Sequence, residues 1–486
     1  MANVAGMRRS ITAAAMSAAL SIGVAAPAFA NPTPGADHLG DRVFTNLGNG
    51  GYDVGHYDVA FDYRPGTPLM DSAVRIDATA TQDLSSFSLD STVRKLNSVR
   101  VDGRPAQFRT QDSTEKLYVT PDRPLAKGKR FAVEISYVSD RTYDPVSPAP
   151  ADPRNVHWFE KPDGFVTFAQ PDRAHEFFPG NDHPSDKATI TSHITVPSDV
   201  QAVSNGTLRD KKTEGGRTTY TFGTRDPIPT DTAVFAVGHF TELDAKGPNG
   251  LPLRSSVATA QADASKAFVD DIPSQVAWVE KQLGPYPFET YGVLGVDGGY
   301  FAAMENATLS TFDAKSGLQG DIAHTATMVH ELVHQWFGDA VSVNRWSDDM
   351  WLSEGHASLY SFLYQGDKGF RPTETGLKQW YEQDNSFRAS DGPPGRPKDT
   401  ISVLGTTNSA ALMLYGLRTM VGPDTFQRIE QTFFRQFRNR AASTQDYIDV
   451  ANRLSGKDYT AYFKDWLYGD HTPPMPGHPD WAPGQA

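Results

Sequence analysis

The sequence lacks cysteine, and it has too few lysines and arginines to balance its acids. Without cysteine, the 486-residue chain can form neither a disulfide nor a cysteine-linked lipid anchor, so its stability must come from the size of its core. Lysine and arginine number 45 against 58 acidic residues, which gives a formal charge of −13 at pH 7. This charge argues against nucleic acid and anionic membranes as partners.

Long hydrophobic runs are also missing, with one exception near the N-terminus. Residues 11–26 are mainly apolar, follow the pair Arg8-Arg9 and precede Ala28-Phe29-Ala30. A basic segment, a short apolar segment and an A-x-A site predict a secretory signal peptide over residues 1–30, cleaved after Ala30. The arginine pair also suits a twin-arginine signal, so the export route stays open. Either route predicts a secreted protein. The chain has no second apolar run long enough to span a membrane, so we expect no membrane anchor.

The first half of the remaining chain has a hydrophobic period of two residues. About 455 residues would remain after cleavage, which suggests two or three domains. From about residue 51 to 243, apolar residues alternate with polar ones between turn signals such as Asn205-Gly206. This pattern predicts an antiparallel β-domain over residues 45–245. The alternating apolar positions include Val59, Phe61 and Tyr63; Phe131, Val133, Ile135 and Tyr137; and Ile190, Ile194 and Val196.

A turn-rich segment at residues 246–250 (KGPNG) marks a change from strands to helices. We interpret it as a linker, with a second, mainly helical domain over residues 246–475 and a frayed tail over 476–486. The segment 321–337 is apolar nearly all round, which predicts a buried helix with Asp321 as its N-cap and Gly338 just past its end. The predicted helices span residues 261–283, 321–337, 349–364, 408–421, 424–438 and 444–455.

An HExxH sequence, His330-Glu331-Leu332-Val333-His334, lies inside that apolar helix. Residues i and i+4 of a helix lie on the same face, so both imidazoles can reach one cation while Glu331 stands beside it. Glu354 follows twenty residues after His334 and offers a carboxylate. Two imidazoles and a carboxylate suit Zn²⁺ and leave a fourth position for water. These residues predict one zinc per chain in a hydrolytic site with Glu331 as the base.

Two nearby features have simpler explanations. His356 lies two residues past Glu354, and on a helix that spacing points to the opposite side, so we expect a structural role for it. Asn306-Ala307-Thr308 matches a glycosylation sequon, but it overlaps a motif described next, and we discount it.

Several motifs in order resemble the aminopeptidase N family, peptidase family M1, from about residue 50 to 475. The AAMEN box is the most specific of them, because an unrelated zinc peptidase with HExxH would not carry it. The motifs are Gln170, residues 177–189 (FFPGNDHPSDKAT), 284–288 (GPYPF), 302–306 (AAMEN), 334–339 (HQWFGD) and 351–355 (WLSEG).

The resemblance implies an α+β fold in which an antiparallel β-saddle precedes a thermolysin-like zinc peptidase domain, without the family's C-terminal helical domain. It implies zinc on His330, His334 and Glu354, and Glu331 as general base. It also implies that Glu305 binds the free α-amine of a peptide, in keeping with the need of a buried carboxylate for a cation. The other substrate-side positions that it implies are Gln170, Ala302, Ala303, Met304 and Asn306.

The chain departs from the family pattern at specific positions. Ala302 replaces a glycine, and its Cβ could impair close approach to the substrate backbone. Nineteen residues separate His334 from Glu354, one more than is usual, and a loop near Asp348 can absorb the extra residue. Thr407 stands where the family has a tyrosine that donates to the oxyanion, and losing such a donor typically costs ~10²–10³ in kcat. The tyrosines considered as its replacement are Tyr360, Tyr381 and Tyr415.

The sequence therefore predicts a secreted zinc aminopeptidase that acts on peptides with free N-termini. Two alternatives stay open: a peptide-binding pseudoenzyme, impaired at Thr407 and Ala302, and a zinc endopeptidase with an open cleft. Glu305 favours the aminopeptidase over the endopeptidase, and Thr407 is the residue that separates it from the pseudoenzyme. The oligomeric state and the preferred N-terminal side chain are not indicated by the sequence.

Overall fold

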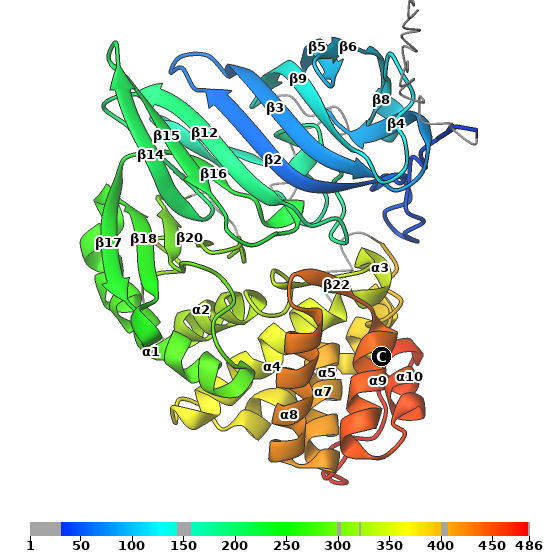
Figure 1. The fold of residues 1–486 in the computed structure, drawn as a ribbon. Helices are drawn as coiled ribbons and strands as arrows, with labels where there is room; N and C mark the ends of the chain where they lie inside the picture. Colours follow the sequence, from blue (N-terminus) through cyan, green and yellow to red (C-terminus); the bar gives the residue numbers. More distant parts are fainter. Residues whose placement is uncertain (1–30, 143–156, 299–302, 320–321, 400–406, 485–486) are drawn as a thin grey trace, which may run out of the picture.

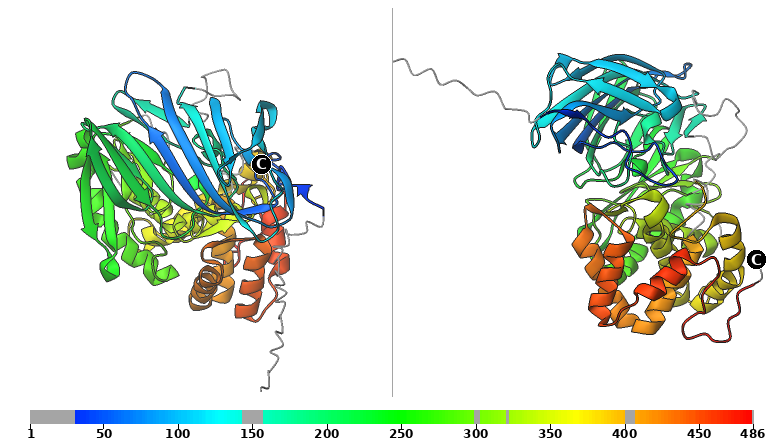
Figure 2. Two further views of the ribbon diagram at one scale, coloured as in Figure 1. Left: turned by 45° about the horizontal axis from the view of Figure 1, so that its top comes forward. Right: turned by 90° about the vertical axis from the view of Figure 1, so that its right-hand side faces the viewer.

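The computed structural model describes residues 31–142, 157–298, 303–319, 322–399 and 407–484. The predicted signal peptide, Ala302 and the predicted N-cap Asp321 lie outside these residues. A β-rich N-terminal half sits on a C-terminal half that is mostly helical (Figures 1 and 2), which confirms the predicted α+β architecture. In the described residues, no helix combines the length and the apolar character needed to cross a membrane.

An eight-stranded sheet forms the body of the N-terminal half. Its central strands bury alternate residues, including Val59, Phe61, Val133 and Ile135, so the predicted period of two is confirmed. One pair, β12 with β2, is parallel rather than antiparallel, because periodicity reports which face is buried and not the direction of a strand's neighbour. The strand order is β14 (Thr207–Glu214), β15 (Arg217–Gly223), β12 (Thr189–Pro197), β2 (Tyr52–Asp62), β3 (Leu69–Ala80), β9 (Arg130–Asp140), β5 (Lys95–Val101) and β6 (Arg104–Pro105).

Two four-stranded sheets complete this half. The first begins with β1, before residue 45, so the N-terminal domain starts earlier in the chain than predicted. The first sheet contains β1 (Thr33–Pro34), β4 (Leu84–Asp90), β8 (Lys116–Thr120) and β7 (Gln107–Gln111), and the second contains β10 (Trp158–Lys161), β11 (Gly164–Thr167), β16 (Phe235–Gly238) and β13 (Gln201–Ser204).

The predicted domain boundary near residue 245 is wrong by several residues. Residues 246–250 form a hairpin loop in which the Gly247 N–H donates to the Leu251 carbonyl at 2.8 Å, instead of a linker. The loop joins β17 and β18, and both strands belong to a sheet of the C-terminal half. A turn-rich segment has the same composition in a hairpin as in a linker, so composition could not separate the two. This sheet has the order β17 (Phe240–Lys246), β18 (Pro252–Ala258), β19 (Val293–Val296) and β20 (Ser310–Asp313).

The six predicted helices match helices of the C-terminal half within a few residues, but three helices of this half were not predicted: the short α3, α5 and α10. Helix α5 was missed because its buried side includes the ion pair Asp384–Arg388 (2.6 Å) beside Leu377 and Tyr381, so its pattern is not hydrophobic. Helix α4 packs against both α2 and α7. The helices are α1 (Ala262–Leu283), α2 (Ile322–His334), α3 (Trp346–Asp349), α4 (Trp351–Asp367), α5 (Thr373–Asp391), α7 (Thr407–Val421), α8 (Pro423–Phe437), α9 (Thr444–Ser455) and α10 (Thr460–Tyr468), and a short parallel pair joins β21 (Val341–Val343) to β22 (Arg440–Ala442).

The tail, for which fraying was expected over residues 476–486, packs against the helices as far as it is described. Trp481 is only 8% exposed, and its ring stacks on Tyr415 with centroids 6.4 Å apart. The Gly484 N–H donates to the Glu382 carbonyl at 2.9 Å. The aromatic residue in a Pro/Gly-rich tail was the signal that fraying was the wrong expectation.

Replacing Trp481 by alanine should therefore destabilise the protein by about 3 kcal/mol, because truncating a buried tryptophan typically costs ~3–5 kcal/mol. Thermal unfolding of the variant measures this loss. Phe370→Ala, which truncates an aromatic side chain that is 40% exposed, is the matched control and should cost much less. Equal melting temperatures for Trp481→Ala and the parent would contradict the packed tail.

Candidate active site

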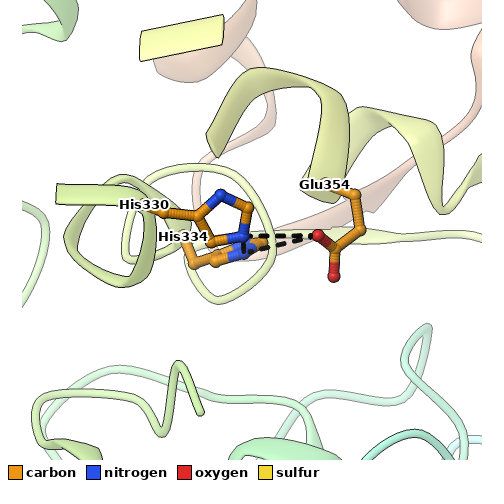
Figure 3. Close-up of side chains that lie close together, drawn as sticks. All are labelled: His330, His334 and Glu354. Atoms are coloured by element: carbon orange, nitrogen blue, oxygen red, sulfur yellow. Dashed lines mark hydrogen bonds and ion pairs between the residues drawn. The ribbon is translucent and has the colours of Figure 1, made fainter. Parts of the chain in front are cut away.

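Three side chains from two packed helices of the C-terminal half converge (Figure 3). His330 and His334 project from α2, and Glu354 projects from the first turn of α4. The Nε2 atoms of the two histidines lie 3.1 Å apart, and Oε2 of Glu354 lies 3.4 Å from His330 Nε2 and 3.9 Å from His334 Nε2. The one extra residue between His334 and Glu354 is thus absorbed before α4 begins.

This donor set fits zinc. Ligand atoms placed ~2.0–2.2 Å from a tetrahedral zinc are about 3.3–3.5 Å apart, close to the separations seen here. All three donors belong to one group of atoms within 4.8 Å of one another. Two imidazoles and one carboxylate leave the fourth position of a tetrahedron open, as catalytic zinc sites do.

The Nδ1 atom of each histidine, which points away from the three converging donors, contacts a serine hydroxyl. His334 Nδ1 lies 2.9 Å from Ser353 Oγ and 3.2 Å from the Phe337 carbonyl, to which the Ser353 hydroxyl donates. His330 Nδ1 lies 3.4 Å from Ser358 Oγ. These contacts place the Nδ1 proton of His334 on the outside and leave Nε2 free to bind a metal.

Gly338 is required where α2 turns away from the site. Its φ is +129°, and a Cβ at this position would lie 2.6 Å from Ser353 Oγ and 3.3 Å from His334 Nδ1. Any side chain would displace the group that orients His334. The glycine predicted just past the helix end is therefore also part of the support of the metal ligand.

Burial and neighbouring charges shift the pKa values of the histidines and carboxylates at the site. Burial lowers the pKa of His334 to about 4. Burial would also lower the pKa of His330, but Glu354, Glu331 and Glu305 outweigh it and raise that pKa to about 9. Burial raises the pKa of Glu331 to about 8, opposed by His330 and assisted by Glu305 and Glu354. A divalent cation among these groups would favour ionised carboxylates and neutral imidazoles.

Glu305 and Gln170 lie beside this group. Glu305 is 4% exposed, its Oε1 accepts a hydrogen bond from Gln170 Nε2, and the same oxygen lies 3.9 Å from His334 Nδ1. Glu305, Glu331 and His334 also form a second group with ligand atoms within 4.8 Å. Burial raises the pKa of Glu305. Gln170 comes from the N-terminal half, so the two halves of the molecule meet at this carboxylate.

The remaining residues of the AAMEN box do not all face the site. Met304 is fully buried in an apolar cluster. The Asn306 side chain is also fully buried, and its Oδ1 accepts from the Thr311 hydroxyl at 2.7 Å. Their positions do not support substrate contacts for these two side chains, which anchor the segment instead. Because the Asn306 side chain is fully buried, the glycosylation sequon is inaccessible. Ala303 is partly buried, and Ala302 lies outside the described residues.

Thr407 is the first residue of α7 and is partly exposed. Two of the tyrosines considered as replacements are engaged elsewhere: Tyr381 donates to the Pro473 carbonyl at 3.1 Å, and the Tyr415 hydroxyl contacts Glu374 and His478, both at 3.3 Å. Tyr360 is buried with its ring against Trp278. In the described part of the chain, none of these three hydroxyls has a hydrogen bond to His330, His334 or Glu354.

The sequence analysis missed several supporting residues. Gln335 accepts from the Thr308 N–H at 2.7 Å and donates to the Glu305 carbonyl at 3.2 Å, which fixes the AAMEN segment to α2. Asp231 and Asp339 are buried near Glu305, and burial raises the pKa of both. A polar residue next to a metal ligand in an apolar helix was the available signal for Gln335. His356 has the structural role that was predicted, with Nε2 2.9 Å from Glu430 and its ring on Phe337.

Comparison with known proteins gives consistent matches over most of the chain. The description "Peptidase M1 N-terminal domain" matches residues 54–231, and "Peptidase family M1 domain" matches residues 273–466. Probable aminopeptidase 2 of Sulfurisphaera tokodaii is 25% identical over 410 residues, which are 79% of this chain and 50% of that protein. Glutamyl aminopeptidase of Homo sapiens is 28% identical over 321 residues, 60% of this chain and 33% of that protein. This chain thus spans half or less of these two relatives.

A solved structure matches over nearly the whole chain. It is a mutant of the M1 zinc metallopeptidase of Deinococcus radiodurans bound to a Tyr-Ser-Ala substrate. Its TM-score is 0.80 at 28% identity, and the match covers 91% of this chain and 100% of that one.

The contact between Ser353 and His334 predicts that Ser353→Ala should weaken zinc binding about 10–100-fold, as is usual when the outer partner of a ligating histidine is removed. Competition with a chelator measures this change. Ser361→Ala is the matched control, because its hydroxyl also joins α4 to α2, through the Ala326 carbonyl at 2.9 Å, but touches no ligand. Equal zinc affinity in all three proteins would show that Ser353 does not orient His334.

Proposed function

This chain belongs to peptidase family M1, and on that premise we propose that it is a secreted zinc aminopeptidase that removes N-terminal residues from peptides. The observation that carries the proposal is the position of Glu305, whose carboxylate lies 3.9 Å from the ring of a metal ligand. A buried carboxylate so close to the donor set can hold an α-ammonium group and present the first peptide bond to the site. Counting from a free N-terminus is what distinguishes an aminopeptidase from an endopeptidase.

The residues of the chain divide the chemical work among them. Zinc held by His330, His334 and Glu354 would act as a Lewis acid on the scissile carbonyl and bring the pKa of water towards ~7. Glu331 accepts a proton from the attacking water and returns it to the leaving amine. Glu305, supported by Gln170, binds the ammonium group and positions the substrate.

Secretion is part of the proposal and rests on residues 1–30 alone. The basic pair, the apolar run and the A-x-A site together support export and cleavage after Ala30.

One observation favours a second candidate, a peptide-binding pseudoenzyme. Thr407 occupies the position at which the resemblance places a catalytic tyrosine, and the hydroxyls of Tyr381 and Tyr415 are bonded elsewhere. Without a phenol at the oxyanion, turnover would be slow even if peptides bind well. The alternative of an endopeptidase depends on cleavage of substrates without a free amine, and Glu305 argues against it.

The general-base role predicts that Glu331→Gln keeps its zinc but loses hydrolysis by at least about 10²-fold, because glutamine cannot accept a proton. Release rates on a panel of aminoacyl-amide substrates measure activity, and elemental analysis of the same samples controls for the metal. A chelator should abolish the activity of the parent. Unchanged turnover in Glu331→Gln would mean that another group is the base.

The amine-binding role predicts that Glu305→Ala loses at least about 30-fold in kcat/KM on substrates with a free amine, because removing one partner of a buried charge pair costs about 2–5 kcal/mol. Cleavage of N-acetylated versions of the same peptides is the internal control and should change little. Equal losses on both substrate types would argue for the endopeptidase.

Because Thr407 stands where the family has a tyrosine, Thr407→Tyr should raise kcat by up to about 10²-fold. Substrate affinity should change little, since the added donor acts mainly in the transition state. Steady-state kinetics measure both quantities, and Thr407→Val controls for the loss of the threonine hydroxyl. A fast parent enzyme that Thr407→Tyr slows would show that another group already serves the oxyanion. A silent parent rescued by the substitution would support the pseudoenzyme.

A further inference from the structure

A pocket of about 390 Å³ lies in the N-terminal half, between the segment that joins β4 to β5 and the edge strand β7. In Figure 1, β4 and β5 lie in the upper part of the β-rich half, and α2 and α4 lie below that half. The volume is within the range of small-molecule sites. None of the residues implied in catalysis lines it.

The charged lining of the pocket is mainly cationic, although the chain as a whole carries −13. Arg94, Lys95 and Arg109 contribute to it, against a single acid, Asp112. The Arg109 guanidinium lies 3.7 Å from the centroid of the Tyr118 ring, and Arg94 Nε is 3.9 Å from Asp140. Within the described residues, neither Lys95 nor Arg109 has an ion-pair partner. A local excess of positive charge in an acidic protein favours an anionic ligand.

Two residues that line the pocket carry buried hydroxyls without a partner in the described part of the molecule. Ser91 is 7% exposed, and its Oγ makes no hydrogen bond in the described part of the molecule. The Oγ1 of Thr92 is also buried without a partner. Both residues line the pocket. Buried hydroxyls are normally bonded, so a pair without partners in a cationic pocket indicates a place for acceptor oxygens.

The backbone beneath these hydroxyls is firmly held. The Ser91 N–H donates to the Glu115 carbonyl at 2.9 Å, and the Thr92 N–H donates to the His175 carbonyl at 3.2 Å. Just before them, Asp90 forms a buried ion pair with Lys116 at 2.5 Å. The backbone that carries the hydroxyls is therefore held in place before binding, which reduces the entropy lost on binding.

One wall of the pocket is apolar. Phe108 is 42% exposed, one of the most exposed large hydrophobic side chains described, and Val93 and Leu96 also line the pocket. An inorganic anion would leave this surface in water, whereas an organic anion would cover it.

We propose that this pocket binds a small organic oxyanion, a phosphate ester or a carboxylate, with the oxyanion on Ser91, Thr92, Lys95 and Arg109 and its apolar part against Phe108. The site is separate from the zinc site and does not depend on the proposed peptidase activity. The two kinds of oxyanion share the same acceptor chemistry, and the choice between them is left to the probes.

Calorimetric titration of the zinc-loaded protein with phenyl phosphate, benzoate, inorganic phosphate and the neutral benzamide tests the proposal. Phenyl phosphate or benzoate should bind at least about tenfold more tightly than benzamide, and phenyl phosphate more tightly than inorganic phosphate. The stronger of the two aromatic anions identifies the class of ligand. Because anions can also bind zinc, the titration is repeated with His334→Ala, in which binding to the pocket should persist.

Variants separate the pocket from other surfaces. Ser91→Ala, Lys95→Ala and Arg109→Ala should each weaken binding about tenfold or more, whereas Lys212→Ala, an exposed lysine on β14, should not. Phe108→Ala should remove the advantage of phenyl phosphate over inorganic phosphate. Ser91→Ala should keep or raise the melting temperature, since its hydroxyl has no partner to lose. The proposal would be overturned if neither aromatic anion bound saturably, if neither bound more tightly than benzamide, or if binding were lost in His334→Ala but kept in Ser91→Ala.

Discussion

The packing of α4 on α2 is the contact on which the candidate active site depends. It places the carboxylate of Glu354 within 4 Å of two imidazoles from the other helix, and it buries Glu331 in the same volume. Ionisable groups held so closely away from water are unstable without a compensating charge. The raised pKa values of Glu331 and His330 express that conflict, and a divalent cation would lower both. The packing of the two helices thus favours a metal at the same place as the chemistry does.

The N-terminal half contributes more than a cover. It supplies Gln170, which donates to Glu305, and Lys187, whose buried ammonium donates to the carbonyls of Asp339 and Ala340 in the segment between α2 and β21. A third contact runs the other way, from the Ser342 hydroxyl to the Pro184 carbonyl at 2.7 Å. Because these bonds all end at or near the site, the relative position of the two halves determines the position of the Glu305 carboxylate.

The sequence predicted the parts of the structure that depend on local spacing. The four-residue spacing of His330 and His334 is sufficient to place both rings on one helix face, and the motif order identified the family, which the comparisons confirm. Contacts between distant segments were not accessible in this way. The parallel pairing of β2 with β12, the place of β17 in a sheet of the C-terminal half, and the packing of Trp481 all depend on partners outside the local sequence. Helix α5 was missed because an ion pair occupies positions where a hydrophobic pattern was sought. The role of Thr407 stays a prediction, because it concerns a donor that acts in the transition state.

The central claim is that the convergent donors of α2 and α4 hold zinc, and metal analysis of the protein purified without chelator tests it most directly. The account predicts one zinc per chain, tightly held, and its loss in His334→Ala, where an incomplete ligand set remains. Protein that folds normally but contains no zinc, and takes up none when zinc is supplied, would contradict it.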